Sequence, residues 1–226
     1  MSHKVSRHLR IEVATYDRKI RQFVPGYETM LRIASALTAE VKPGHVLDLG
    51  SGSGGLSEAL LSYPEIGIVE LWDIDPEMLE HAQVRLSDYR ERVHFELKSF
   101  NDLFPACDAI TACISLHHVP NLEKKQALYQ RAYNALRPGG IFVNADAVVP
   151  THGKEKERLY RYWARHLVAS GIPEERAWQH FEEWAEEDSY FSLGEELAAL
   201  TAVGFDAHCV WREGPSAVLL GRREPQ

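Results

Sequence analysis

Apolar runs of strand length alternate along the chain with segments in which apolar residues recur at helical spacing. We expect seven strands: HVLDLG (45–50), GIVELWDI (67–74), RVHFELK (92–98), CDAITACIS (107–115), GIFVNADAV (140–148), FDAHCVW (205–211) and SAVLLGR (216–222). Helix-sized segments with turn residues at their ends separate the first five runs, as parallel β-α-β units require. The pattern predicts an α/β protein built on a mostly parallel sheet.

The connections refine this topology. Residues 136–140, LRPGG, combine a helix stop with the start of the fifth strand. Only Arg212 to Pro215 separates the last two runs, which is too short for a crossover helix. The sheet is therefore expected to end in an antiparallel strand pair.

Two pieces fall outside the alternation. Residues 9 to about 40 carry apolar groups at helical spacing, interrupted at Pro25 and Gly26. Residues 151–190 are charged and aromatic, with apolar faces typical of a helical hairpin. We divide the chain into an N-terminal helical lid (1–40) and a core (41–226) that contains the helical insertion 151–190.

Composition narrows the function classes. The 226 residues carry a formal net charge of −8, which argues against broad binding to nucleic-acid backbones. The cysteines, Cys107, Cys113 and Cys209, are odd in number and widely spaced, so neither a disulfide framework nor a metal site is expected. The sequence shows no secretory or membrane-spanning segment. A cytoplasmic protein without bound metal is the expectation.

The stretch VLDLGSGSGG ends a predicted strand in a glycine loop. Gly50, Gly52 and Gly55 satisfy the dinucleotide pattern G-x-G-x-x-G, whereas Gly50, Gly52 and Gly54 make the tighter G-x-G-x-G turn. Asp48 decides between them, because its carboxylate would oppose a pyrophosphate at the following helix N-terminus. The same charge would attract the ammonium and sulfonium of S-adenosylmethionine, which is therefore the expected cofactor.

Several ordered motifs resemble class I S-adenosylmethionine-dependent methyltransferases of the small-molecule branch. They are VLDLGSGSGG, ELWDIDPEML, CDAITACISLHHVP and LRPGGIFV. The resemblance implies a Rossmann-like fold in which Asp73 takes the ribose hydroxyls and Ile74 packs on adenine. The other residues that it implies for the cofactor in this part of the chain are Asp48, Gly50, Ser51, Gly52, Gly54, Met78, Ile114 and His117.

The turn after the third strand departs from the family pattern. Many relatives have Gly-Asp-Ala there, with the aspartate on the adenine amine, whereas this chain reads Lys98, Ser99, Phe100. The Ser99 hydroxyl can still donate a hydrogen bond and the Phe100 amide can still face the ring. Both are retained as candidate cofactor residues. Asp75, in contrast, is expected to cap the helix that begins at Pro76.

The N-terminal stretch TYDRKIRQFVPGYETML resembles that of carboxy-S-adenosylmethionine synthases and related methyltransferases. The match implies that Tyr27 contacts the cofactor and that Tyr16 belongs to a lid, although both could simply fix a helix to the core. The residues at two positions argue against the synthase activity. The arginine that holds the extra carboxylate would fall at Phe181, and a cofactor-contacting asparagine at Cys113.

Candidate catalytic groups lie at the expected carboxyl edge of the sheet. His117 and His118 follow the fourth strand, and Asp146 ends the fifth. We take His118 as the candidate general base and Asp146 as the second candidate, with a structural histidine as an equal alternative. The acidic run 182–188 is either a hydrated helix face or a feature that favours an amine substrate.

These features favour methyl transfer to a small-molecule acceptor by in-line displacement. The alternatives are a cofactor-modifying enzyme similar to carboxy-S-adenosylmethionine synthase and a protein that binds S-adenosylmethionine without catalysis. Aromatic residues of the insertion could line the acceptor pocket or form a homodimer interface.

Overall fold

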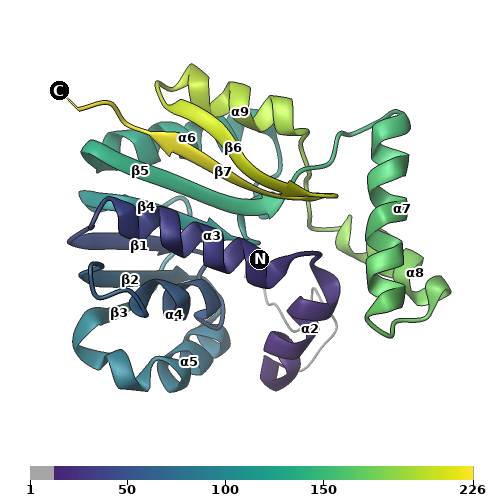
Figure 1. Ribbon diagram of the computed structural model, residues 1–226, viewed down its shortest axis with the longest axis horizontal. Helices are drawn as coiled ribbons and strands as arrows, with labels where there is room; N and C mark the ends of the chain where they lie inside the picture. Colours follow the sequence, from purple (N-terminus) through teal and green to yellow (C-terminus); the bar gives the residue numbers. More distant parts are fainter. Residues whose placement is uncertain (1–12, 226) are drawn as a thin grey trace.

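The computed structural model describes residues 13–225, in which one seven-stranded sheet organises the chain (Figure 1). Its order is β3-β2-β1-β4-β5-β7-β6, and only β7 runs against its neighbours. The strands are β1 (His45–Leu49), β2 (Ile68–Asp73), β3 (Val93–Leu97), β4 (Cys107–Cys113), β5 (Leu136–Ala147), β6 (Asp206–Glu213) and β7 (Ser216–Arg222). The predicted α/β class and the antiparallel pair at the end are confirmed.

Two sequence-based expectations about the connections are wrong. No helix forms in residues 98–106, between β3 and β4, where the chain runs as turns and loop. The strand β5 begins at Leu136 rather than at Gly140, because Leu136 already pairs with Cys107 before a register shift in the ladder. The Gly139 amide donates to the carbonyl of Arg223 at 3.0 Å, which extends the pairing through the expected helix stop.

Helices cover both faces of the sheet because its strands present apolar side chains to both sides. On one face lie α3 (Tyr27–Glu40), α4 (Gly55–Leu61) and α5 (Pro76–Arg85), which pack on residues such as Val46. On the other lie α6 (Leu122–Ala135) and α9 (Leu193–Ala202), which pack on residues such as Leu47. Short 3₁₀ turns form at η1 (Val13–Thr15), η2 (Ser87–Arg92) and η3 (Leu116–His118).

The two pieces outside the alternation are helical, as expected. In the first, α3 packs on the sheet, whereas α2 (Tyr16–Phe23) lies beyond the end of the sheet (Figure 1). The second also lies beyond the end of the sheet and forms the hairpin of α7 (Lys154–Ala169) and α8 (Glu174–Trp184). The indole Nε1 of Trp163 in α7 donates to the carbonyl of Phe23 at the end of α2, at 2.6 Å. Residues 9–12 of the N-terminal segment lie outside the described residues.

The longest helix in the described part of the chain is α7, with 16 residues. Within residues 13–225 no helix combines the length and the apolar character needed to cross a membrane.

Candidate active site

The turn between β1 and α4 requires glycine. Gly50, Gly52 and Gly54 have φ angles of +64°, +56° and +80°, a region that other residues rarely adopt. A Cβ atom on Gly50 would lie 2.6 Å from the Cβ of Ser115, so the backbone there approaches the loop after β4 without space for a side chain. The glycines therefore leave bare backbone amides facing the end of the sheet.

The carboxylate of Asp48 lies beneath this turn and is buried. Its Oδ2 accepts a hydrogen bond from Ser57 Oγ at 2.6 Å, and its Oδ1 accepts one from Thr111 Oγ1 at 3.0 Å. Burial raises the pKa of Asp48 from 3.8 to about 6 despite these hydrogen bonds. Asp48 thus carries a desolvated charge and helps to fix the turn. It also lines a small pocket with Tyr16, Tyr27 and residues 50–53.

Asp73, at the end of β2, is the second carboxylate beside the turn. Its Oδ2 accepts from the Gly52 amide and its Oδ1 from the Asp75 amide, both at 2.8 Å. The predicted capping role of Asp75 is confirmed, because its side chain accepts from the Glu77 amide at 3.1 Å. Of the neighbouring candidates, Met78 is fully buried near Gly52, whereas Ile74 is 38% exposed.

The loop after β3 separates its two candidates. The amide and the hydroxyl of Ser99 both donate to Asp102 Oδ2, at 2.7 and 3.1 Å. Phe100 instead lines a second, larger cavity, the main cavity, near Gly50. Phe100 therefore lies at the glycine turn, whereas Ser99 forms hydrogen bonds within its own loop.

Helix α2 is joined to the glycine turn through Asp17. The Ser53 hydroxyl donates to Asp17 Oδ1 at 2.6 Å, and Arg85 of α5 forms an ion pair with the other oxygen. The neighbouring Tyr16 lines both the small pocket and the main cavity, and burial raises the pKa of its phenol. Tyr27 is buried, with its hydroxyl against Gly55. Both tyrosine candidates thus lie at the turn.

The main cavity extends from the glycine turn to the helical hairpin and holds about 890 Å³ of space, including its opening to solvent. Gly50, Gly52 and Asp73 line one end of it. Aromatic side chains line the other: Phe23, Trp163, Trp184 and Tyr190. Neither lysine nor arginine is among the described residues that line it. Phe181 is buried in the aromatic cluster beside Trp163.

A histidine and carboxylate cluster also faces this cavity. It follows Ile114, which lines the cavity and holds a strained φ of +49°. Nδ1 of His117 lies 2.7 Å from Asp146 Oδ1, and the His117 amide donates to Asp146 Oδ2 at 3.0 Å. Burial disfavours the imidazolium, but Asp146 and Asp188 outweigh it and raise the pKa of His117. Conversely, although burial opposes ionisation, His117 holds the pKa of Asp146 below its usual value.

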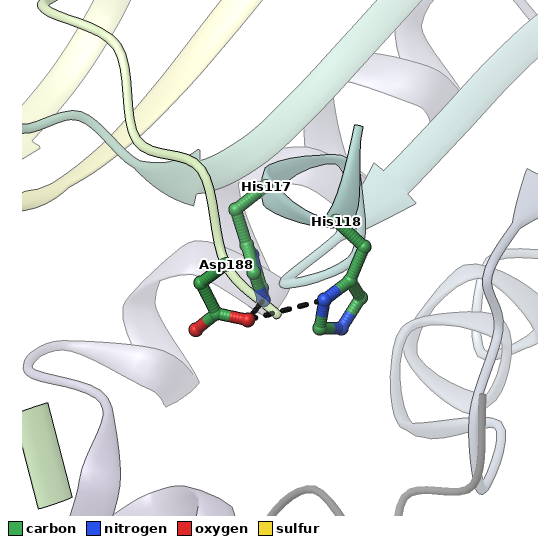
Figure 2. Close-up of side chains that lie close together, drawn as sticks. All are labelled: His117, His118 and Asp188. Carbon is green, nitrogen blue, oxygen red and sulfur yellow. Dashed lines mark ion pairs between the residues drawn. The ribbon is translucent and has the colours of Figure 1, made fainter. Parts of the chain in front are cut away.

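Asp188 joins the cluster from the loop after α8 (Figure 2). Its Oδ1 lies 3.1 Å from His118 Nδ1 and 3.7 Å from His117 Nε2, and its side chain is only 4% exposed. The Tyr190 hydroxyl donates to Asp188 Oδ2 at 2.6 Å. Sequence reasoning did not single out Asp188, because it ends an acidic run that reads as a hydrated helix face.

Cys113, at the end of β4, lines the small pocket. Burial raises the pKa of its thiol well above the usual value, so the thiolate nucleophile is disfavoured. Cys113 is therefore a small, largely buried residue at the end of its strand.

Comparisons with known proteins find methyltransferases among the relatives of this chain. A family model described as "Methyltransferase domain" matches residues 47–142. A demethylmenaquinone methyltransferase of Leptospira interrogans is 33% identical over 135 residues, which are 57% of this chain and 51% of the relative. A carboxy-S-adenosyl-L-methionine synthase of Helicobacter hepaticus is 25% identical over 206 residues, covering 85% of this chain and 83% of the relative. The chain thus spans about half the length of the first of these relatives.

Solved structures share the fold over most of the chain. An O-methyltransferase family protein from Burkholderia thailandensis matches with a TM-score of 0.68 and 16% identity, covering 100% of this chain and 65% of that one. Human N-acetylserotonin methyltransferase, solved in complex with S-adenosylmethionine, matches with a TM-score of 0.59 and 19% identity. That alignment covers 98% of this chain and 60% of the human protein.

Proposed function

We propose that the chain, whose residues 47–142 match a methyltransferase domain and whose fold is shared with a solved O-methyltransferase family protein, transfers a methyl group from S-adenosylmethionine to a small-molecule acceptor. One observation carries the proposal: a single cavity is lined by Gly50, Gly52 and Asp73 at one end and by His117, His118 and Asp188 at the other. In-line displacement needs the sulfonium and the acceptor to meet in one enclosed space. The cavity supplies that space.

The cofactor half of the cavity suits a cation. Asp48 and Asp73 both lie beside the glycine turn, and their charges favour a sulfonium and an ammonium over a pyrophosphate. We propose that the remaining cofactor contacts come from Tyr16, Tyr27 and Phe100, with Ile74, Met78 and Ser99 kept as candidates near adenine.

Ordinary S-adenosylmethionine is preferred to its carboxylated form. A second carboxylate needs a guanidinium or ammonium partner, and the described residues that line the cavity include no arginine or lysine. Phe181 occupies the position at which the resemblance to the synthase would place the arginine that holds the extra carboxylate. It is buried among aromatic rings. The likeness to the Helicobacter hepaticus synthase keeps the carboxylated cofactor as the second candidate.

The acceptor half of the cavity is aromatic, which favours a largely apolar acceptor with one hydroxyl or amine. Bound S-adenosylmethionine would supply the methyl carbon: the lone pair of the acceptor group would form the new bond to it, and the electron pair of the broken C–S bond would stay on sulfur. We propose that His118 takes the acceptor proton. Both oxygens of Asp146 already accept hydrogen bonds from His117, so Asp146 acts as a positioning residue for His117.

Water must be excluded during transfer. We propose that α2, within the N-terminal segment 1–40, and the insertion 151–190 act together as a lid, since Trp163 and Phe23 join them at the cavity. The partner is a small molecule rather than nucleic acid, given the net charge of −8.

A cytoplasmic location is supported by three free cysteines in the described residues. Trp178, 41% exposed on α8, supports a homodimer contact.

Calorimetry with S-adenosylmethionine tests the cofactor. We expect binding by the wild-type protein and its loss in Asp73→Arg, which removes the acceptor proposed for the ribose hydroxyls and places a bulky cation beside the turn. Glu65→Arg, at an exposed position, is the charge-matched control and should bind normally. Binding of NAD but of no S-adenosyl compound would refute the proposal.

Mass spectrometry of the ligand that copurifies separates the two cofactor candidates. An unmodified S-adenosylmethionine or its demethylated product supports methyl transfer, whereas an extra carboxylate on the sulfonium supports the synthase-like alternative. Tight binding without turnover across a broad panel of phenols and amines would instead favour a protein that binds the cofactor without catalysis.

A further inference from the structure

The cluster of His117, His118 and Asp188 has a second property. We propose that these side chains bind a divalent transition-metal ion at the acceptor end of the cavity. Their candidate ligand atoms all lie within 4.8 Å of one another (Figure 2). Two imidazoles and one carboxylate are a donor set that suits zinc, iron, cobalt or nickel.

The distances fit one shared ion. Two ligands held about 2.0–2.1 Å from a tetrahedral ion are separated by roughly 3.3 Å. Asp188 Oδ1 lies 3.1 Å from His118 Nδ1 and 3.7 Å from His117 Nε2, values on either side of that separation. Two of the three separations thus match a shared ion, and the third, between the two histidine nitrogens, is at most 4.8 Å, so side-chain rotation would bring the three atoms around one ion.

Supporting hydrogen bonds hold the atoms that face away from the cluster. Asp146 Oδ1 lies 2.7 Å from His117 Nδ1, which directs the other ring nitrogen toward Asp188. The Tyr190 hydroxyl donates to Asp188 Oδ2 at 2.6 Å and leaves Oδ1 toward the histidines. A carboxylate behind a ligating histidine and a hydrogen-bonded ligating carboxylate are typical surroundings of protein-bound metals.

The site has the form of a reactive centre rather than a structural one. All three residues line the main cavity, so a fourth coordination position would face the space proposed for the acceptor. Resting on the proposed function, the ion would bind the acceptor oxygen and lower its pKa, so that the proton leaves to solvent before the lid closes, in place of proton transfer to His118. This proposal departs from the expectation of no metal, which considered the spacing of cysteines.

Metal titration of the full-length protein without a purification tag tests the site. The protein is treated with a chelator, dialysed and titrated with Co²⁺ or Zn²⁺ in the absence of S-adenosylmethionine. We expect one ion per chain and visible absorption from bound Co²⁺. Asp188→Asn and His118→Ala should weaken Co²⁺ binding by more than about 100-fold, and Tyr190→Phe, which keeps all three ligands, by about 10- to 100-fold.

His208→Ala is the matched control. It removes an exposed imidazole that lies 2.8 Å from Asp206 on β6, and it should leave the affinity unchanged. Circular dichroism of each metal-free variant checks folding, and the two ligand variants come from different segments, so one unfolded variant does not end the test. Absence of one-to-one Co²⁺ binding, or wild-type affinity in a folded ligand variant, overturns the proposal.

Cofactor calorimetry on the same metal-free protein keeps the two proposals apart. Binding of S-adenosylmethionine without Co²⁺ binding refutes the metal site alone. Binding of Co²⁺ without binding of any S-adenosyl compound refutes the proposed function alone.

Discussion

Nδ1 of His117 lies 2.7 Å from Oδ1 of Asp146, and this contact joins the loop after β4 to the end of β5. The pairing of Cys113 with Ala145 in the adjacent strands sets the two side chains at the same edge of the sheet. Because Asp146 holds one ring nitrogen, the other is directed toward Asp188 and the cavity. The geometry links the fold of the sheet to the orientation of a candidate catalytic side chain.

Asp146→Asn is expected to lower kcat by about 10- to 100-fold while the affinity for S-adenosylmethionine stays the same. An amide cannot support the His117 ring as a carboxylate does, although the side chain keeps its shape. Steady-state kinetics with an acceptor identified from the panel gives kcat and KM separately. Nitrogen NMR of the His117 ring should show a changed tautomer, and an unchanged ring spectrum would argue against the positioning role.

The affinity for S-adenosylmethionine is expected to fall as the pH is lowered through about 6. The pKa of Asp48 is raised from 3.8 to about 6, so acid protonates the carboxylate that we propose attracts the sulfonium. The affinity should fall by at most about tenfold per pH unit below this value. Calorimetry between pH 5 and 7.5 measures the slope, and Asp48→Asn should bind more weakly with a flatter profile.

The same pKa predicts the opposite trend for the ligand-free protein. Because the folded-state pKa of Asp48 lies above the unfolded value, its stabilising contribution is fully present below pH 3.8 and is lost as the pH rises through about 6. Thermal unfolding of wild type and Asp48→Asn, compared at pH 5 and 7.5, isolates this contribution. An Asn variant with the wild-type dependence on pH, in affinity and in Tm, would show that another group titrates.

Gly50→Ala is expected to abolish measurable cofactor binding. An alanine at φ +64° costs about 1–2 kcal/mol, and its Cβ would lie 2.6 Å from the Cβ of Ser115. Calorimetry and denaturant unfolding measure the two effects. Gly194→Ala in α9 is the control, because nothing lies within 4 Å of its added Cβ. The control should keep its affinity and change the free energy of unfolding by no more than about 1 kcal/mol.

Trp163→Phe is expected to loosen the contact between α7 and α2. The change keeps an aromatic ring but removes the donor to the Phe23 carbonyl, at a cost of about 1–3 kcal/mol. Hydrogen exchange should increase in α2 and α7, and KM for the acceptor should rise more than the Kd for the cofactor. Trp178→Phe, at an exposed position on α8, is the matched control. Equal exchange in both variants would contradict a role for this hydrogen bond in the lid.

Much of the fold could be predicted from local patterns in the sequence. The strand at residues 45–49, the glycine turn and the cap at Asp75 follow from neighbouring residues, and all three form as expected. The prediction of a helix in residues 98–106 was wrong. The segment is long enough for a helix, but it forms turns and loop instead. The early start of β5 depends on pairing with Cys107 and with Arg223, which are distant in sequence.

The candidate site was predictable only in part for the same reason. His117, His118 and Asp146 lie at strand ends, where a parallel sheet gathers its ligands. Asp188 lies after the last turn of α8, and only the tertiary fold turns it inward. Helical periodicity assigns such a residue to the solvent, and no local rule reverses that assignment.

Gly50, Gly52 and Asp73 belong to the first half of the chain, whereas Asp188 and most of the aromatic cavity wall belong to the insertion 151–190 after β5. Exchange of that insertion for another of different sequence would leave the glycine turn intact while changing which molecules fit opposite it. This division gives the scaffold a route to diversify in evolution: new substrate ranges can arise by variation in one segment of about forty residues.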